Sequence, residues 1–343
     1  MWYEGARMGQ GGGDMDSVGV IGGGAWGTAL AQTQRLAGRK ATLWAREPEV
    51  VADVNERHVN AAFLPGVELD PGLTATGDLA GIAACDIILM VAPAQHVRAV
   101  ARELRPLLRP GQIVVNCAKG IEQATGKLMG EVLAEALPEA SLAVLSGPSF
   151  AADVARGLPT ALTIATERED QGRRLAESLG YRQFRLYWSR DRVGAEIGGA
   201  VKNVLAIAAG IVAGKGLGSS AHAALVARGF AELRRFGQAF GAEPETMMGL
   251  SGLGDLILTC GSPQSRNMSL GRALGEGRSI DEILGARRAV TEGVWTAAAV
   301  VRLARERGIE MPIAEAVHAI VEARASVDDA IAALLSRPFK AEG

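Results

Sequence analysis

A lysine inside an apolar stretch is the residue of this sequence best suited to acid–base chemistry. Lys202 lies in GGAVKNVLAIAAG (198–210), where nearly all neighbouring side chains are small or aliphatic. A lysine is rarely buried without a partner, and burial lowers its pKa toward the range where it can exchange a proton. Hydride transfer to a carbonyl leaves an alkoxide that must gain a proton, and such a lysine could supply it. A lysine that only snorkels to the surface or caps a helix explains the residue equally well.

Three glycines near the N-terminus have the spacing of a dinucleotide-binding loop. Gly22, Gly24 and Gly27 form G-x-G-x-x-G within VIGGGAWGTALA (20–31), after a β-branched run and before a helical pattern. In such a loop the first glycine permits the tight turn, the second lets the backbone approach a pyrophosphate, and the third lets helix and strand pack closely. The helix N-terminus adds a favourable field for an anion. We therefore predict a dinucleotide site, with a plain strand-to-helix turn as the alternative.

The residue after the next predicted strand bears on the choice of cofactor. The chain reads LWARE, so that Arg46 comes first and Glu47 follows. An acidic residue at this point binds a ribose 2′-hydroxyl, whereas an arginine accepts a 2′-phosphate. The sequence thus allows NADP(H) and does not exclude NAD(H). An exposed arginine without a role is the alternative interpretation.

Two further stretches carry groups that suit a charged substrate. Asp255 lies in GLSGLGDLILTC (249–260), where its carboxylate could orient Lys202 or simply cap a helix. Ser265, Arg266 and Asn267 stand at a predicted helix start, and a guanidinium, hydroxyl, amide and backbone N–H groups together can bind a phosphate. A capping serine followed by an exposed arginine is the alternative there.

The elements that must position these residues divide the chain in two. Up to about residue 190, apolar strands (17–22, 40–46, 85–93, 111–120 and 141–149) alternate with amphipathic helices, which predicts a parallel sheet wrapped by helices. Long Ala-, Leu- and Val-rich helical segments follow at 193–213, 221–240, 266–274 and 295–307. We predict an α/β N-terminal Rossmann domain with a parallel-rich doubly wound sheet over 17–190, after a flexible extension at 1–16. An all-α C-terminal domain at 191–343 completes the chain.

Composition excludes several classes of function. The 343 residues carry a net charge of −2, which leaves no basic footprint for nucleic acid. The apolar run at 204–214 is too short to span a bilayer and predicts a buried helix, so we expect no membrane insertion. Three scattered cysteines and an N-terminus without an apolar signal core favour a reducing cytoplasmic location. We expect no metal site, because the histidines have no ligand-like spacing and are predicted to be surface or capping residues: His58, His96, His222 and His318.

Taken together, these motifs give the sequence a family resemblance. From about Val18 to about Val317 it resembles the bacterial NAD(P)-dependent sn-glycerol-3-phosphate dehydrogenases. The stretches that carry the resemblance are GAWGTALA, FLPG (63–66), AKGIE (118–122), LSGPSFAADVARGLPTA (145–161), GGAVKNVLAIAAG, GLSGLGDLILTC, SRN (265–267) and VTEG (290–293). The glycine motif alone is not specific, but this set in this order is.

The resemblance implies reversible reduction of dihydroxyacetone phosphate to sn-glycerol 3-phosphate, a precursor of membrane phospholipids, in a cleft between the two domains. It implies that Lys202 exchanges the proton and that NAD(H) or NADP(H) is the cofactor. The substrate-binding residues that it implies are Lys119, Gly147, Ser149, Lys202, Asp255, Ser265, Arg266 and Asn267. The cofactor-binding residues that it implies are Gly22, Gly24, Ala25, Trp26, Gly27, Arg46, Lys119, Ala151, Arg266, Val290 and Glu292.

One stretch departs from the family pattern. Family members often read GLGFGDNxxAAL after the lysine helix, whereas this chain reads GLGSSAHAAL (216–225), which is two residues shorter and lacks the Asp-Asn pair. We therefore name no ligand between Ser219 and His222. A 3-hydroxyacid dehydrogenase or imine reductase of the same plan is the alternative function, and a non-catalytic dinucleotide sensor is a more distant one. The oligomeric state stays open, with a homodimer as one option.

Overall fold

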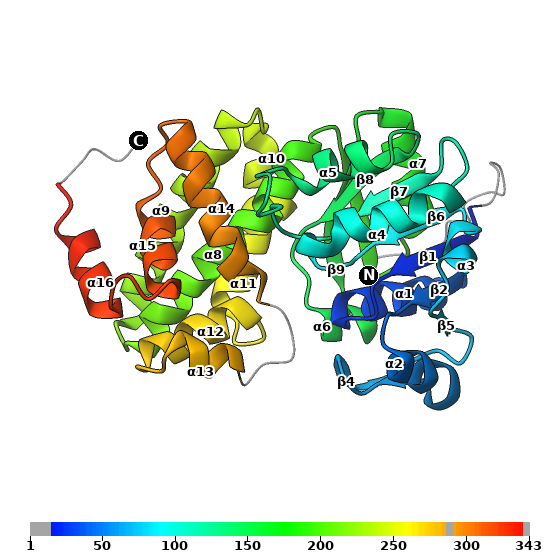
Figure 1. The fold of residues 1–343 in the computed structure, drawn as a ribbon, viewed down its shortest axis with the longest axis horizontal. Coiled ribbons are helices and arrows are strands. Elements are labelled where there is room, and N and C mark those ends of the chain that lie inside the picture. Colours follow the sequence, from blue (N-terminus) through cyan, green and yellow to red (C-terminus); the bar gives the residue numbers. More distant parts are fainter. Residues whose placement is uncertain (1–14, 286–290, 339–343) are drawn as a thin grey trace, which may run out of the picture.

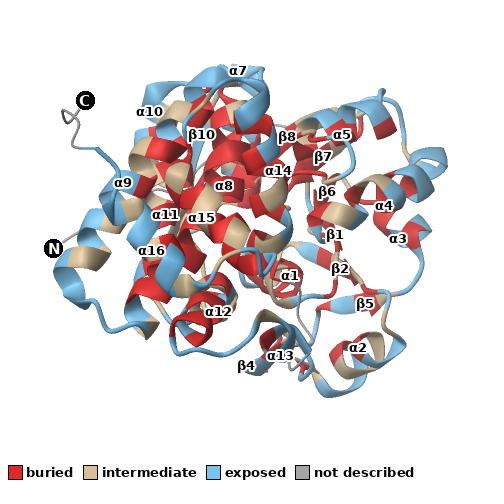
Figure 2. Cartoon of the chain, turned by 60° about the vertical axis from the view of Figure 1, so that its left-hand side comes forward, coloured by how far each residue is buried: buried red, intermediate tan, exposed pale blue. Residues whose placement is uncertain are grey.

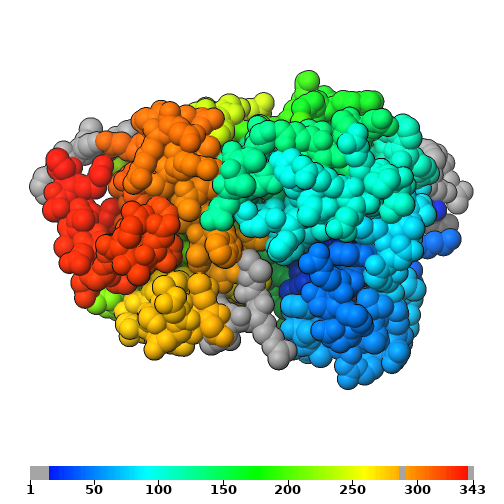
Figure 3. All heavy atoms as spheres, viewed as in Figure 1, coloured from blue at the N-terminus to red at the C-terminus, as the bar shows by residue number. Residues whose placement is uncertain are grey.

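The computed structural model of the chain describes residues 15–285 and 291–338. The extension predicted over 1–16 therefore lies outside the described residues except for Met15 and Asp16, and so does Val290. The described chain forms a sheet-containing half and a helical half, which lie at opposite ends of the long axis in Figure 1 and meet at its centre in Figure 3.

The first half is built on an eight-stranded sheet with the order β10-β9-β8-β7-β6-β1-β2-β5. Its central strands are buried on both faces, as in a parallel sheet covered by helices. Val20 and Leu89 point into one core, whereas Ile21 and Ile88 point into the other. The strands are β1 (Ser17–Ile21), β2 (Lys40–Trp44), β5 (Thr74–Thr76), β6 (Ile87–Met90), β7 (Ile113–Asn116), β8 (Ser141–Ser146), β9 (Thr160–Ala165) and β10 (Phe184–Ser189).

Helices cover both faces of this sheet, as the alternating pattern predicts. A two-stranded antiparallel ribbon of β3 (Val59–Asn60) and β4 (Leu64–Glu68) lies outside the main sheet. The α-helices are α1 (Ala25–Leu36), α2 (Pro48–Ala52), α3 (Leu79–Ala83), α4 (Val97–Leu104), α5 (Met129–Ala136), α6 (Ala151–Ala155) and α7 (Glu169–Leu179). Other helical turns are η1 (Asp53–Arg57), η2 (Ala94–His96) and η3 (Arg105–Leu107).

The direction of β9 differs from the sequence-based expectation of a parallel sheet. β9 runs antiparallel to β8, and β10 then runs parallel to β9, whereas the other pairs of the main sheet are parallel. The connection before β9 contains only the five-residue helix α6, which does not carry the chain back across the sheet as a crossover helix does. The sheet is parallel-rich, and the predicted fold class is confirmed.

In the second half the described residues form helices only. All four predicted helical segments are helical in the structure. The elements are α8 (Arg192–Gly214), α9 (Gly218–Ala239), α10 (Pro244–Met248), η4 (Leu250–Gly254), α11 (Asp255–Gly261), α12 (Arg266–Gly275), α13 (Ile280–Gly285), α14 (Glu292–Glu306), α15 (Pro312–Val321) and α16 (Val327–Leu335).

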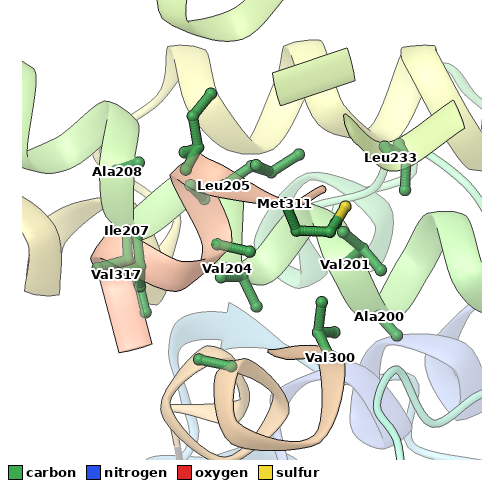
Figure 4. Close-up of a cluster of buried hydrophobic side chains, with 14 of the residues drawn as sticks. Ala200, Val201, Val204, Leu205, Ile207, Ala208, Leu233, Val300, Met311 and Val317 are labelled. Carbon is green, nitrogen blue, oxygen red and sulfur yellow. The ribbon is translucent and has the colours of Figure 1, made fainter. Parts of the chain in front are cut away.

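Helix α8 forms the centre of this half. By length and apolarity it is the single helix among the described residues that could cross a membrane, yet 89% of its most apolar window is buried inside the protein. Figure 2 shows α8 among buried residues. In Figure 4, Val201 and Val204 lie near Val300 of α14 and Val317 of α15. The predicted buried helix is confirmed, although the sequence stretch at 204–214 covers only its C-terminal part.

Close contact between α8 and α12 depends on glycine. A Cβ atom on Gly271 would lie 1.9 Å from the carbonyl oxygen of Ile207, and one on Gly210 would lie 2.0 Å from that of Met268. The two helices can therefore approach until their backbones touch. This contact brings the start of α12, with Ser265–Asn267, to the middle of α8, which carries Lys202.

The cysteines and one of the histidines are buried. The three cysteines are free thiols with at most 7% exposure. The surface or capping role predicted for the histidines is wrong for His318, which is 9% exposed within α15. It lies on the same helical face as Ala314 and Val321, which packs against the core.

Candidate active site

The glycine loop between β1 and α1 has the geometry of an anion cradle. Gly22 has a φ of +132°, and a Cβ atom on Gly27 would lie 1.9 Å from the carbonyl oxygen of Gly22. The Cβ position of Gly24, in contrast, faces open space. Gly24 precedes the 12-residue helix α1, which has no acidic residue in its first turn. The loop thus leaves room for a ligand at a helix N-terminus that favours negative charge.

Several predicted site residues lie at one edge of the sheet. Gly22 follows β1, Arg46 follows β2, Lys119 follows β7 and Gly147 follows β8, and these strands are mutually parallel in the order β8-β7-β6-β1-β2. Because β1 lies between β6 and β2, the chain reverses its order of strand addition at this point. Ligands of open α/β sheets bind at this edge, beside such a reversal.

Lys202 is buried and bonded to two side chains of one helix. Lys202 is 6% exposed, and its Nζ donates hydrogen bonds to Asp255 Oδ1 at 2.5 Å and to Thr259 Oγ1 at 2.7 Å. Asp255 is fully buried at the first position of α11, and Thr259 lies one turn further on. Of the two sequence-based interpretations of Asp255, the structure places its carboxylate on Lys202, as an orienting group would lie. The third proton of Lys202 has no acceptor among the described residues.

A second lysine shares the same carboxylate. Lys119 Nζ donates to Asp255 Oδ2 at 2.8 Å and to the carbonyl oxygen of Gly147 at 3.0 Å. Ser149 Oγ contacts the same carbonyl at 3.3 Å. One buried carboxylate therefore joins two ammonium groups, and the cluster carries a net positive charge when both lysines are protonated. Such a cluster favours an anionic substrate or a developing oxyanion.

The surroundings of Lys202 tune its proton affinity. Burial lowers the pKa of Lys202 to about 8, with Asp255 opposing this shift and the positive charge of Lys119 adding to it. The ammonium form therefore predominates at neutral pH while a modest pH change removes its proton. A general acid or base works best with a pKa close to the working pH.

The SRN segment at the start of α12 is held by hydrogen bonds within α12 and to α8 and α14. Ser265 caps α12, since its Oγ accepts a hydrogen bond from the backbone N–H of Met268 at 3.2 Å. Asn267 donates to Asn203 Oδ1 at 2.9 Å and accepts from the backbone N–H of Gly293 at 3.0 Å. Asn203 follows Lys202 directly, so this amide pair ties α12 and α14 to the lysine helix.

Glu292 connects the two halves of the molecule beside Arg266. Its Oε1 accepts a hydrogen bond from the backbone N–H of Ala94, in the turn after β6, at 3.2 Å. The pKa of Glu292 is raised, because burial outweighs the lowering effects of this hydrogen bond and of the charge of Arg266. Its Oε2 is buried without a hydrogen-bond partner among the described residues. The structure thus brings Arg266 and Glu292 to the strand edge that carries the glycine loop.

The remaining predicted cofactor residues lie around the glycine loop and the sheet edge. Arg46 is exposed, as a group that binds a 2′-phosphate or a surface arginine would be. Ala25 and Trp26 begin α1, and the indole N–H of Trp26 is buried without a hydrogen-bond partner among the described residues. Ala151 begins α6. The open side of Gly24 and the unpartnered Trp26 fit a dinucleotide bound over the start of α1.

Sequence reasoning missed two residues that shape the site. Thr259 bonds Lys202, and its spacing of four residues from Asp255 on one helix was the available signal. Asn60 donates to the carbonyl oxygen of Gly23 and to Thr28 Oγ1, both at 2.8 Å, and so holds the glycine loop. No sequence signal marked Asn60, because it reaches the loop from the separate β3–β4 ribbon.

Comparison with known proteins agrees with this geometry along most of the chain. Residues 17–172 match the model for the N-terminus of NAD-dependent glycerol-3-phosphate dehydrogenase, and residues 191–332 match the model for its C-terminus. The chain belongs to the NAD-dependent glycerol-3-phosphate dehydrogenase family. It is 62% identical over 325 residues to glycerol-3-phosphate dehydrogenase [NAD(P)+] of Parvibaculum lavamentivorans, covering 95% of this chain and 98% of that one. It is 59% identical to the Maricaulis maris protein of the same name, covering 96% and 99%.

Solved structures of this dehydrogenase family share the fold. The crystal structure of glycerol-3-phosphate dehydrogenase from Coxiella burnetii has a TM-score of 0.90 and 38% identity, over 94% of this chain and 99% of that one. A ketopantoate reductase from Ralstonia eutropha is 20% identical, with a TM-score of 0.59, over 92% and 99%. That second likeness shows the fold alone.

The stretch that departs from the dehydrogenase pattern, 216–225, covers the end of the connection between α8 and α9 and the first turns of α9. α8 ends at Gly214 and α9 begins at Gly218, with Gly216 and Gly218 both at positive φ. His222, early in α9, forms a 3.0 Å hydrogen bond between its Nε2 and the carbonyl oxygen of Cys260. This segment thus lies against α11, the helix that carries Asp255 and Thr259.

Proposed function

We propose that this dehydrogenase interconverts dihydroxyacetone phosphate and sn-glycerol 3-phosphate, with a nicotinamide dinucleotide as the hydride carrier. The observation that carries the proposal is the buried cluster of Lys202, Asp255 and Lys119, which lies at the carboxyl edge of the strands beside a glycine loop. Membership of the family and the names of its closely similar relatives support the same reaction.

In the direction of reduction, Lys202 acts as the general acid. Asp255 and Thr259 hold the ammonium in place, and its third proton is the one that Lys202 would give to a substrate oxygen. Loss of the proton to the C2 oxygen is favoured because burial has already lowered the pKa of Lys202. In the oxidation of sn-glycerol 3-phosphate, neutral Lys202 takes the proton from the C2 hydroxyl.

The residues around the glycine loop would hold the cofactor. Gly22, Gly24, Ala25, Trp26 and Gly27 would bind its pyrophosphate region, with Arg46 beyond the second strand. Lys119, Ala151, Arg266, Val290 and Glu292 would complete this site. When bound, the nicotinamide supplies or accepts the hydride.

Substrate binding is assigned to groups of both parts of the chain. Lys119, Gly147 and Ser149 come from the proposed dinucleotide-binding domain at 17–190, and Lys202, Asp255, Ser265, Arg266 and Asn267 come from the proposed substrate domain at 191–343. The substrate phosphate would lie at the N-terminus of the ten-residue helix α12, where Arg266 offers a bidentate guanidinium. We further propose that the reaction supplies a phospholipid precursor in the cytoplasm.

The test of this function is a nicotinamide absorbance assay. The purified protein is given dihydroxyacetone phosphate with NADH and, in parallel, with NADPH. The proposal requires oxidation of at least one cofactor, with sn-glycerol 3-phosphate as the product. A 3-oxo acid and an imine serve as the comparison substrates, and turnover of either in place of the phosphate would overturn the assignment. Sedimentation of the same sample measures whether it is a homodimer.

The two directions of the reaction should depend oppositely on pH. Reduction needs the ammonium form of Lys202, so its rate should fall as pH rises through about 8, the pKa of this residue. Oxidation needs the neutral amine, so its rate should rise over the same range. The measurement is kcat/KM against pH in both directions, because this ratio reports the pKa values of the free enzyme. Profiles that move in the same direction would contradict the assignment of Lys202.

Arg46→Ala should discriminate between the two cofactors. Arg46 is exposed just beyond β2, where a 2′-phosphate would lie. Loss of one charge-assisted contact costs about 1.5–3 kcal/mol, so the KM for NADPH should rise roughly 10- to 100-fold while that for NADH changes little. Arg39→Ala at the other end of β2 is the control. Equal effects on both cofactors would remove Arg46 from the 2′-phosphate site.

Arg266→Ala should discriminate between phosphorylated and unphosphorylated substrates. If its guanidinium binds the phosphate, kcat/KM for dihydroxyacetone phosphate should fall by roughly 10- to 100-fold, and the slow turnover of dihydroxyacetone should be nearly unchanged. Arg272→Ala, on an exposed part of the same helix, is the matched control. A parallel loss with both substrates would indicate a role in cofactor binding or folding instead.

A further inference from the structure

Helix α8 also carries a buried carboxylate, which lies between Lys202 and the start of the helix. Glu196 is 7% exposed, and its Oε1 accepts hydrogen bonds from Asn116 Nδ2 at 3.0 Å and from the backbone N–H of Gly130 at 2.6 Å. Asn116 ends β7, and Gly130 lies in the first turn of α5. Glu196 therefore reaches from the helical half into the sheet half of the molecule.

Asn116 controls the backbone that leads to Lys119. Its Oδ1 accepts a hydrogen bond from the backbone N–H of Ala118 at 3.0 Å, and its Nδ2 contacts the carbonyl oxygen of Ala118 at 3.3 Å. Lys119 is the next residue. The turn between β7 and Lys119 is thus shaped by one asparagine, whose amide is in turn held by Glu196.

The stem of Lys119 lies against the same helix. A Cβ atom on Gly199 would lie 3.3 Å from Lys119 Cγ, so this side chain crosses α8 one turn after Glu196 and one turn before Lys202. From there its ammonium group reaches Asp255. α8 therefore supports Lys119 in two ways. It lies against the side chain at Gly199, and Glu196 holds Asn116, which shapes the backbone before Lys119.

We propose that Glu196 is a positioning residue that, through Asn116, fixes segment 116–119 against α8 and so places Lys119 on Asp255. The inference rests on the proposed function, in which Lys119 contacts the substrate. In this role Glu196 acts through Asn116 and Lys119 and not by its own contact with the substrate.

A general role in helix capping would not require this arrangement. Glu232 offers the comparison, because it is 2% exposed and accepts hydrogen bonds from the backbone N–H groups of Ile313 and Ala314 at the start of α15. Burial raises the pKa of both glutamates to about 7, so holding either carboxylate in place is costly. Glu196 differs in bonding a side chain that leads directly to a site residue.

The test combines truncation with a reversal of hydrogen-bond polarity. Glu196→Ala should lower kcat/KM for dihydroxyacetone phosphate by about 10- to 100-fold, because a small misplacement of a substrate-binding group has effects of this size. Glu196→Gln should stay within about threefold of wild type, since its amide oxygen can accept the same two donors. Asn116→Asp should be impaired as strongly as Glu196→Ala, because two acceptors then face each other. The double variant Asn116→Asp/Glu196→Gln restores a donor–acceptor pair and should recover most of the loss.

Two controls separate positioning from stability. Glu232→Ala should lower the thermal midpoint without changing kcat/KM. In Glu196→Ala the midpoint pH of reduction should move upward, because a displaced Lys119 no longer lowers the pKa of Lys202. If Glu196→Ala does not fold, the comparison of Asn116→Asp with the double variant decides, since both keep a polar side chain at positions 116 and 196. A double variant no better than Asn116→Asp would overturn the proposal.

Failure of this inference is distinguishable from failure of the proposed function. Wild-type protein without turnover of dihydroxyacetone phosphate would contradict the function itself. Lys119→Met with unchanged kcat/KM would show that Lys119 does not contact the substrate, and the inference would fall with that role. A strong loss in Lys119→Met, with none in Glu196→Ala, would contradict only the role of Glu196.

Discussion

Lys202→Met should lower kcat by at least about 10²-fold while leaving the fold and the affinity for NAD(P)H nearly unchanged. Methionine retains the bulk of the stem but has neither the charge nor the proton, and general acid–base catalysis alone contributes about 10²–10⁴-fold. Loss of charge stabilisation at the developing oxyanion adds to this effect. The fold should tolerate the change because Asp255 keeps its ion pair with Lys119 at 2.8 Å. The measurements are kcat in both directions and cofactor affinity by fluorescence.

The lysine directly after the end of the same helix provides the control. Lys215 follows the last residue of α8 and pairs with Asp328 near the surface. Lys215→Met should therefore keep wild-type kcat. Near-normal kcat in Lys202→Met would make Lys202 a structural residue and the proposed mechanism wrong.

Asp255→Asn is expected to have the second largest effect. The fully buried carboxylate joins two ammonium groups, and loss of one partner of a buried ion pair typically costs about 3–5 kcal/mol of stability. Because Asp255 raises the pKa of Lys202 and Lys119 lowers it, removing the carboxylate should move this pKa below about 8. The midpoint pH of reduction should shift downward with it, and kcat/KM at neutral pH should fall by on the order of 10²-fold.

The shift in the pH profile is the decisive readout, because simple destabilisation does not produce it. Asp328→Asn is the matched control, since its carboxylate is 75% exposed and its ion pair with Lys215 should contribute little. An unchanged midpoint in a folded Asp255→Asn protein would mean that the carboxylate does not tune Lys202.

The glycine loop and the fold class could be predicted from sequence because their signals are local. Gly22, Gly24 and Gly27 lie within six residues that follow an apolar strand, and their conformational demands belong to that one turn. The buried α8 likewise reveals itself by composition. A lysine in such a helix is conspicuous whatever the helix packs against.

Sequence alone could not choose between the interpretations of Lys202, Asp255 and Asn267. Lys202 and Asp255 are 53 residues apart, and Lys119 and Asp255 are 136 residues apart, so no periodicity relates them. Asn267 was predicted as a phosphate ligand, which stays a prediction, but the structure also gives its amide two protein partners in α8 and α14. The antiparallel direction of β9 could not be predicted either, because it depends on the path of the connection between β8 and β9.

The sequence by itself determined which side chains are available for acid–base chemistry and anion binding, together with the classes of element that carry them. Only the tertiary structure decided that the carboxylate of Asp255 pairs with both Lys119 and Lys202, and that Glu196 reaches the turn before Lys119. The physical reason is that burial, hydrogen bonding and pKa depend on which distant segments meet. Close backbone contacts such as that at Gly271 determine which segments lie side by side, and these contacts exist only once the helices have packed.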